Sequence, residues 1–252
     1  MLEILSQVFE PDGLLGMFAF SPPGWGGNLL VGLLRSMEIA AGAYTVGLII
    51  GVLGAYGKLY GNEVVRDVLA LYTTIVRAVP ELVLILILYY AGPAALNGVL
   101  LQFGFERVAL PQMPVGIMVL GVVLGAYMTE VLRGAILAVP VGQIEAGRAY
   151  GMPPLLLARR VTLPLMLGNA IPGLSNLWLA ATKDTALLAV IGFGELTLMT
   201  KQAAGSTKSY FSFYIAAGLL YLIVSFVSGR IFGWIERWAR KGQPAVASGG
   251  TL

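Results

Sequence analysis

The chain has 252 residues, of which 58% are hydrophobic and 12% are charged, and its formal net charge is +3. A soluble domain carries about 25% charged residues, so this composition excludes an ordinary soluble protein and indicates one that lies in a lipid bilayer. No cysteine or histidine occurs, which excludes disulfide bonds, thiol redox chemistry and any catalysis or metal binding that depends on histidine.

The first 27 residues lead into the first apolar run. They include Glu3, Glu10 and Asp12 but no lysine or arginine, whereas a secretory signal peptide begins with a basic region. The segment "FSPPGWGG" places Trp25 just before the apolar run, where an aromatic ring suits the membrane–water interface. We therefore expect residues 1–27 to be an interfacial lead-in and not a cleaved signal.

Five apolar runs follow, and several reach the roughly 20 helical residues that cross about 30 Å of hydrocarbon. Their apolar residues do not alternate at every second position, which argues against a transmembrane β-barrel. We predict one all-α polytopic domain with a membrane core at 28–238 and a tail at 239–252. The five predicted spans are residues 28–57, 68–91, 113–137, 163–181 and 211–235.

Basic residues in the connections predict the orientation. Ten lie on one side of the predicted membrane, namely Lys58, Arg66, Arg133, Arg148, Arg159, Arg160, Arg230, Arg237, Arg240 and Lys241. Four lie on the other side, namely Arg107, Lys183, Lys201 and Lys208. Because cytoplasmic loops carry the excess of lysine and arginine, we expect a periplasmic N-terminus and a cytoplasmic C-terminus.

Glycines recur four residues apart in three of the predicted spans, at Gly47/Gly51, Gly121/Gly125 and Gly229/Gly233. Such pairs let helix backbones approach closely. We interpret them as packing positions within the bundle and not as a specific dimer face.

Charged residues inside the spans are costly and are therefore functional candidates. Three pairs stand three or four residues apart, so that helix neighbours can neutralise one another: Arg35/Glu38, Arg77/Glu81 and Glu130/Arg133. Glu81 and Glu130 are also candidates for a polar pathway. Asp184, with Thr185 beside it, and Glu195 have no basic residue three or four positions away. These two acids bracket "TALLAVIGFGE", which contains Gly192 and Gly194 and is expected to fold back into the membrane.

The stretch "EAGRAYGMPPLLLARRVTLP" is polar and rich in turn-forming residues. We predict a short helix from Gln143 to Tyr150 with Glu145 in its first turn, facing the positive end of the helix dipole. Gly151 should close this helix in a left-handed conformation. Pro153 and Pro154 suit the first turn of a second helix through "LLLARR". A bent helix pair on the basic side is a docking surface for a cytoplasmic partner.

This stretch resembles the EAA loop of ATP-binding-cassette (ABC) importer permeases, in which Glu-Ala-Ala is followed after three residues by Gly and after nine more by Ile-any-Leu-Pro. Glu145, Ala146, Gly151, Leu163 and Pro164 stand at the matching positions, while Gly147 replaces the second alanine and Val161 the isoleucine. "YTTIVRAVPELVLILILYY", "GAYMTEVLRGAILAVPVGQIEAGRAYG" and "TKDTALLAVIGFGEL" are similar to the polar amino-acid branch, closest to the Q-type permeases for histidine, lysine, arginine and ornithine and for opines.

The resemblance implies a type I importer of the bacterial inner membrane, with two permeases, two ATPase subunits that bind ATP and Mg²⁺, and a periplasmic amino-acid-binding protein. It implies that the EAA loop, including Arg159 and Arg160, docks on the ATPase. It favours a sister permease as the second copy, without excluding a homodimer. No cofactor or nucleic acid is expected on this chain.

A cationic or zwitterionic amino acid, or an opine that contains one, is the expected cargo. Asp184 and Glu195 would compensate its charge, because an uncompensated charge in the bilayer is costly.

Two alternatives come from other classes of protein. An intramembrane serine or zinc protease requires histidine, and "GFGE" lacks the acidic partner of an aspartyl protease. A phosphate-binding loop is also missing, since "GAYGKLY" has Val52 and Leu59 where that motif needs glycine and serine or threonine.

A stand-alone secondary transporter fits the composition. Many such transporters are built from repeated halves, which five spans do not readily supply. Co-purification of an ATPase subunit would separate the permease from the lone carrier.

Overall fold

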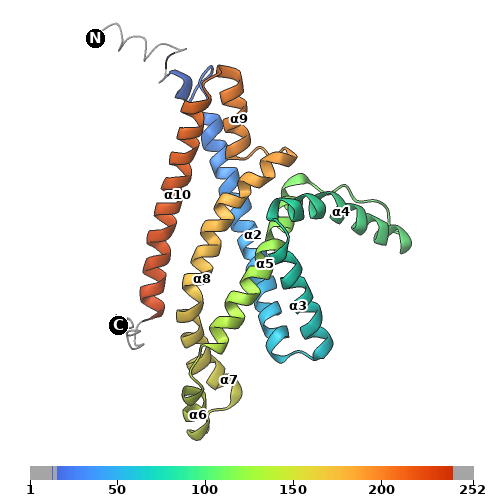
Figure 1. Cartoon of the computed structure of the whole chain (residues 1–252), viewed down its shortest axis with the longest axis vertical. Helices are drawn as coiled ribbons and strands as arrows, with labels where there is room; N and C mark the ends of the chain where they lie inside the picture. Colours follow the sequence, from blue (N-terminus) through green and yellow to red (C-terminus); the bar gives the residue numbers. More distant parts are fainter. Residues whose placement is uncertain (1–12, 14–15, 241–252) are drawn as a thin grey trace.

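The computed structural model of the protein describes residue 13 and residues 16–240. Every regular element in this part of the chain is a helix (Figure 1), which confirms the predicted all-α fold. The segments 1–12 and 14–15 of the predicted lead-in and 241–252 of the predicted tail lie outside the described residues. The helices are η1 (Gly16–Phe18), α2 (Gly26–Tyr60), α3 (Glu63–Ala78), α4 (Glu81–Gln102), α5 (Gln112–Leu137), α6 (Val141–Ala149), α7 (Pro154–Leu157), η2 (Ala158–Thr162), α8 (Leu163–Asp184), η3 (Thr185–Ile191), α9 (Leu196–Thr207) and α10 (Tyr210–Ala239).

Helices α2 and α5 form the centre of the bundle, and glycines hold them close together. A Cβ added to Gly51 would lie 2.6 Å from Met128 Cβ, and one added to Gly125 would lie 2.6 Å from Ile50 Cγ2. Gly47 and Gly121 face the same contact from either side. By contrast, nothing lies within 4 Å of a Cβ added to Gly229. The packing interpretation is therefore confirmed for the first two glycine pairs, and the Gly229/Gly233 pair contacts no neighbouring helix in the described chain.

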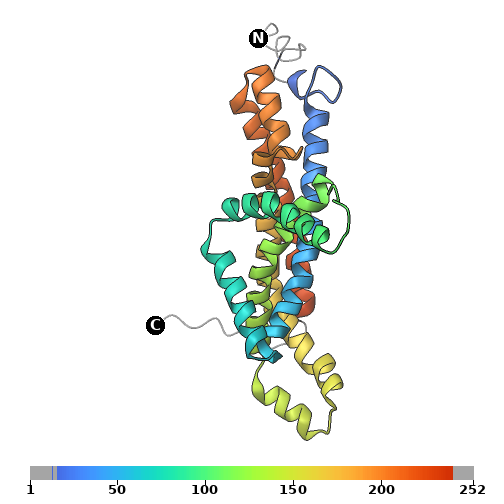
Figure 2. The same cartoon turned by 90° about the vertical axis from the view of Figure 1, so that its right-hand side faces the viewer.

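The second predicted span is not one helix. α3 ends at Ala78 and α4 begins at Glu81, with Val79 extended at φ −94° and ψ 138°. Pro80 explains the break, because it has no N–H to donate and disfavours helical geometry in the residue before it. α3 rises beside α2, while α4 runs sideways from the bundle in both views (Figures 1 and 2). The prediction of one continuous span at 68–91 is therefore wrong, because this part of the chain forms two helices that run in different directions.

The chain after α8 bends as it leaves the long helix. η3 continues α8 to Ile191, Gly192 adopts a left-handed φ of 86°, and α9 starts at Leu196. The two helical parts, 154–191 and 196–207, meet at 54°. A single turn then leads into α10, which runs alongside α8 and α9 (Figure 1).

Among the described residues, α2, α4, α5 and α10 are four helices that are each long and apolar enough to cross a membrane. The bent pair of 154–191 and 196–207 makes a fifth candidate if its two parts form one span. A polytopic protein with about five spans is therefore the observed architecture, although one span is bent and the chain between α2 and α5 is broken.

Candidate functional site

The loop after α5 contains a helix that starts earlier than predicted. α6 begins at Val141 behind Pro140, so Glu145 lies in the second turn and the first turn holds no acid. The expected contact of Glu145 with the helix dipole is therefore wrong, since that effect falls off within the first turn. Glu145 and Ala146 are both exposed. Their side chains are consequently available to a protein that covers this end of the molecule.

Gly151 closes α6 as predicted. Its φ is +74°, and its N–H donates to the Arg148 carbonyl at 2.9 Å while the Met152 N–H donates to the Gly147 carbonyl at 3.1 Å. Glycine adopts this left-handed conformation at no steric cost. The sharp reversal it permits turns the chain back toward α7.

The second helix of the loop continues without interruption into α8. Pro154 occupies its first turn, as predicted, and α7 passes through the π-helical turn η2 into α8. Leu155 is 83% exposed, whereas Leu157 is buried. Leu157 lies where a Cβ at position 147 would be, so glycine in place of the motif's second alanine lets α6 and α7 approach. Four further motif residues on this helix are exposed, namely Arg159, Arg160, Leu163 and Pro164.

A polar cluster lies where the break between α3 and α4 meets the end of α8. Glu81 at the start of α4 interacts electrostatically with Asp184. The Tyr127 hydroxyl on α5 interacts with Glu81, and Tyr127 also lies within electrostatic range of Arg77 and Asp184. The helix break removes the i, i+4 geometry expected for Arg77 and Glu81, and these two residues form no ion pair in the described chain. The break therefore places Glu81 within electrostatic range of Asp184.

Glu195 lies in a different environment, in which its carboxylate is buried and hydrogen-bonded. One oxygen accepts the Leu198 N–H at 2.8 Å and so caps α9. The other accepts from the Ser36 hydroxyl and from the Tyr221 hydroxyl, each at 3.2 Å. Glu195 thus joins α2, α9 and α10. Thr185 is also buried, and its hydroxyl donates to the Thr182 carbonyl at 2.9 Å.

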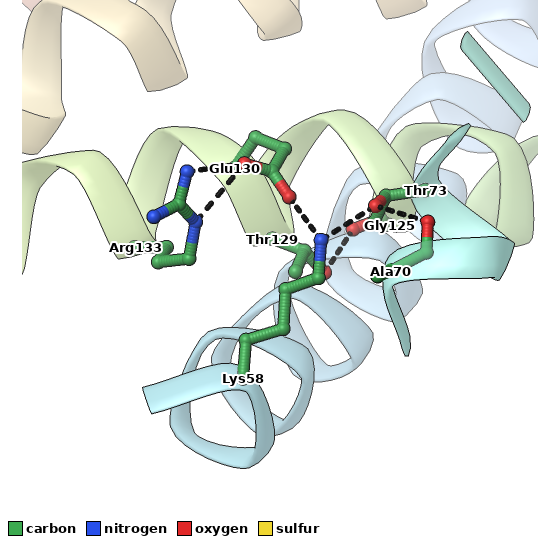
Figure 3. Close-up of polar contacts among 7 residues, drawn as sticks. All are labelled: Lys58, Ala70, Thr73, Gly125, Thr129, Glu130 and Arg133. Carbon is green, nitrogen blue, oxygen red and sulfur yellow. Dashed lines mark hydrogen bonds and ion pairs between the residues drawn. The ribbon is translucent and has the colours of Figure 1, made fainter. Parts of the chain in front are cut away.

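Glu130 is the centre of a third polar group, which joins three helices (Figure 3). Its Oε1 accepts from the Lys58 ammonium at 2.5 Å, and its Oε2 accepts from Arg133 Nε at 3.0 Å and Nη2 at 2.9 Å. Lys58 also donates to the Thr73 hydroxyl at 2.7 Å. The predicted Glu130–Arg133 pair is confirmed. The predicted Arg35–Glu38 pair is absent from the described ion pairs, because Arg35 donates instead to the Gly194 carbonyl at 3.3 Å.

The structure thus brings Glu81 and Asp184 together and separates both from Glu195 and Glu130, which have partners of their own. Sequence reasoning missed Tyr127 and Tyr221, and it treated Lys58 only as a marker of orientation. A polar side chain inside an apolar span was the available signal for the two tyrosines. In the part of the chain that the structure describes, no group of three or more acidic side chains is arranged to hold a metal ion.

A family model described as the inner membrane component of binding-protein-dependent transport systems matches residues 44–241. The chain belongs to this permease family. It is a multi-pass inner-membrane subunit of an ABC importer and not an enzyme, and ATP hydrolysis belongs to separate ATPase subunits.

The permease is similar to named permeases along most of its length. It is 40% identical to the octopine transport system permease protein OccQ of Agrobacterium tumefaciens (strain Ach5), over 90% of this chain and 96% of that protein. It is 38% identical to the histidine/lysine/arginine/ornithine transport system permease protein HisQ of Escherichia coli (strain K12), over 85% and 94%. A crystal structure of an amino acid ABC transporter with histidines has a chain that matches with a TM-score of 0.71 and 29% identity, over 84% and 94%.

Proposed function

We propose that the permease imports basic amino acids or opines that a periplasmic binding protein delivers. The relatives named for octopine and for histidine, lysine, arginine and ornithine support this cargo class. The observation that carries the proposal is the proximity of Glu81 and Asp184 at the break between α3 and α4. Arg77 and Lys183 lie within electrostatic range of this cluster, but neither forms an ion pair with Glu81 or Asp184 in the described residues. The two carboxylates therefore favour the arrival of a further positive charge.

The physical reason for this site is the cost of moving a charge through the membrane. A cationic cargo loses hydration when it enters the bundle, and an uncompensated charge there is unfavourable by several kcal/mol or more. Asp184 and Glu81 would supply opposite charge that is already in place. The substrate pathway was also expected to include Glu195, Thr185 and Glu130. Their polar atoms form hydrogen bonds within the chain, so we propose that these residues stabilise the helices around the pathway.

We infer that the complete importer contains this permease, a related sister permease, two ATPase subunits with ATP and Mg²⁺, and the binding protein. The Q-type relatives favour a sister over a second copy. The excess of lysine and arginine near α6, α7 and the end of α10 supports a cytoplasmic position for that end of the molecule. The lead-in at 1–27 would then be periplasmic and the tail at 239–252 cytoplasmic.

We further propose that the EAA loop at 140–164 couples the permease to the ATPase. Glu145 would pair with basic groups of the ATPase, and Gly151 would set the angle between α6 and α7. Gly151→Arg strains a backbone that L side chains rarely adopt, whereas Gly151→Asn is tolerated better because asparagine visits this conformation. We expect cargo-stimulated ATP hydrolysis to be lost in Gly151→Arg and largely kept in Gly151→Asn. Equal coupling in both variants would reject the role of the turn.

The cargo is tested with the complete importer in proteoliposomes. Uptake of labelled arginine should be competed by lysine, ornithine, histidine, octopine or nopaline, and not by glutamate or leucine. Efficient uptake of leucine or glutamate with no uptake of arginine would reject the proposed cargo class.

A further inference from the structure

An open cavity of about 470 Å³ lies where α2 turns into α3 and meets α5. It is within the size range of small-molecule pockets. Five of its six lining residues are ionisable, and they come from all three helices: Lys58, Glu63, Arg66, Asp67, Ala70 and Arg133. The α2–α3 turn lies at the same end of the bundle as α6 and α7 (Figure 1). The cavity therefore lies toward the end of the bundle that carries the EAA loop.

The charges around this cavity are only partly neutralised within the chain. Lys58 and Arg133 share one carboxylate, that of Glu130 (Figure 3), so this group keeps one positive charge in excess. Arg66, Glu63 and Asp67 form no ion pair in the described residues. The cavity consequently offers unpaired charges of both signs at short range.

We propose that this cavity is a cytoplasmic binding site for a free amino acid, in particular for the cargo after its release. The ligand carboxylate would bind the guanidinium groups of Arg66 and Arg133, which match carboxylates in a two-pronged geometry. Its ammonium group, or a cationic side chain, would bind Glu63 and Asp67. A phosphate or a lipid headgroup with net negative charge fits less well, because these two acids repel it.

Occupation of the cavity acts on the contacts that hold three helices together. Arg133 and Lys58 line the cavity and also bind Glu130, and Lys58 reaches Thr73 on α3. A carboxylate that binds Arg133 competes with Glu130 for the same guanidinium. Because a ligand shifts an equilibrium only through its different affinity for the two states, binding here favours one arrangement of α2, α3 and α5. The site is thus placed to slow further import when the released amino acid accumulates.

This inference rests on the proposed import of basic amino acids, so that function is measured first. The complete importer is reconstituted in proteoliposomes, with ATP in the lumen and with the binding protein and labelled arginine outside. Lumenal ATP drives only importers whose EAA loop faces inward. Absence of any uptake with an arginine-free lumen rejects the cargo class and the inference with it. When uptake occurs, its initial rate is measured against increasing unlabelled arginine in the lumen.

We expect lumenal arginine to inhibit uptake, and inorganic phosphate or agmatine, which lacks the carboxylate, to inhibit far less. Arg66→Gln and Asp67→Asn should each raise the half-inhibitory arginine concentration about fivefold, since each removes one charged contact at an exposed site. Arg237→Gln removes the same charge from α10, away from the cavity, and should leave this value unchanged. Inhibition that is absent, or equal in Arg66→Gln and the unaltered permease, overturns the proposal. Stronger inhibition by phosphate than by arginine does so as well, and assigns the cavity to an anion.

Discussion

Hydrogen bonds distinguish the acids of the bundle from one another. The Glu195 carboxylate accepts from Leu198, Ser36 and Tyr221, whereas Asp184 forms no ion pair within the described residues. A buried carboxylate that accepts hydrogen bonds from several donors stabilises the structure. A carboxylate near a second carboxylate favours the binding of a cation. The two kinds of acid should therefore respond differently to loss of charge.

Removal of charge at the break between α3 and α4 should impair transport of cationic cargo. Asp184→Asn and Glu81→Gln keep the side-chain shape, and each should lower arginine uptake about tenfold, which corresponds to about 1.4 kcal/mol of lost stabilisation. Initial uptake rates at several concentrations of loaded binding protein measure this. Glu236→Gln removes a half-buried acid at the end of α10, which pairs with Arg240 at 3.1 Å, away from the cluster, and is the matched control. Wild-type rates in both test variants would exclude these carboxylates from the cation site.

Loss of the Glu195 side chain should destabilise the permease. Glu195→Ala removes the cap of α9 and leaves the Ser36 and Tyr221 hydroxyls without their acceptor, at a cost of about 3 kcal/mol. Glu195→Gln keeps an oxygen that can cap α9 and should retain most of the stability and the uptake. Thermal unfolding in detergent, monitored by circular dichroism, compares the variants. A strong uptake defect in a fully stable Glu195→Gln variant would instead place this residue on the pathway.

At the scale of the helices, glycine positions explain how α2 and α5 come into contact. Gly47 and Gly51 on α2 face Leu124 and Met128, and Gly121 and Gly125 on α5 face Val46 and Ile50. In a bilayer, close backbone approach replaces the hydrophobic effect as a main source of helix association. The absence of a side chain at these glycines therefore allows the contact, because a single methyl group would separate the helices.

Gly51→Val should disrupt this contact. The new Cβ would lie 2.6 Å from Met128 Cβ and 3.1 Å from the Met128 carbonyl carbon, so backbone must move, and overpacking of this kind typically costs about 1–3 kcal/mol. Gly229→Val makes the same change in α10 at a site with nothing within 4 Å. We expect a lower unfolding temperature for Gly51→Val than for Gly229→Val. Equal temperatures would show that the α2–α5 contact tolerates separation.

Helix boundaries followed local chemistry where strong signals stood in the sequence. Gly151 and Pro154 take the conformations predicted for them. Pro80 carried the same kind of signal, but the apolar run around it led to a prediction of one uninterrupted span. Hydropathy reports how long an apolar stretch is and not the direction in which it runs, so the sideways course of α4 was not foreseeable.

At the scale of the whole permease, the helices give the molecule two different ends. η1 and the start of α2 lie at one end, and the α6–α7 loop lies at the other (Figure 1). Lys58, Arg66 and Arg133 line one cavity toward the second end. Because an excess of basic residues is typical of the cytoplasmic side, a cytoplasmic position for this end stays our prediction.

Introduced cysteines test this orientation directly, because the chain contains none of its own. Tyr150 is 86% exposed in the α6–α7 loop, and Gln102 is exposed at the end of α4. A membrane-impermeant thiol reagent added to cells with a permeabilised outer membrane should label Gln102→Cys. It should label Tyr150→Cys only after the inner membrane is opened. The reverse pattern would invert the proposed topology.

The amino-acid sequence alone determined that the chain is a helical inner-membrane permease, because composition, run length and the spacing from Glu145 to Pro164 are properties of neighbouring residues. Only the tertiary structure decided which charges meet. Glu81 interacts electrostatically with Asp184, and Lys58 pairs with Glu130, across long stretches of sequence. Periodicity places a charge on a helix, but its partner depends on how the helices are broken and packed. The Pro80 break and the glycine contacts between α2 and α5 therefore set the polar contacts that the sequence left open.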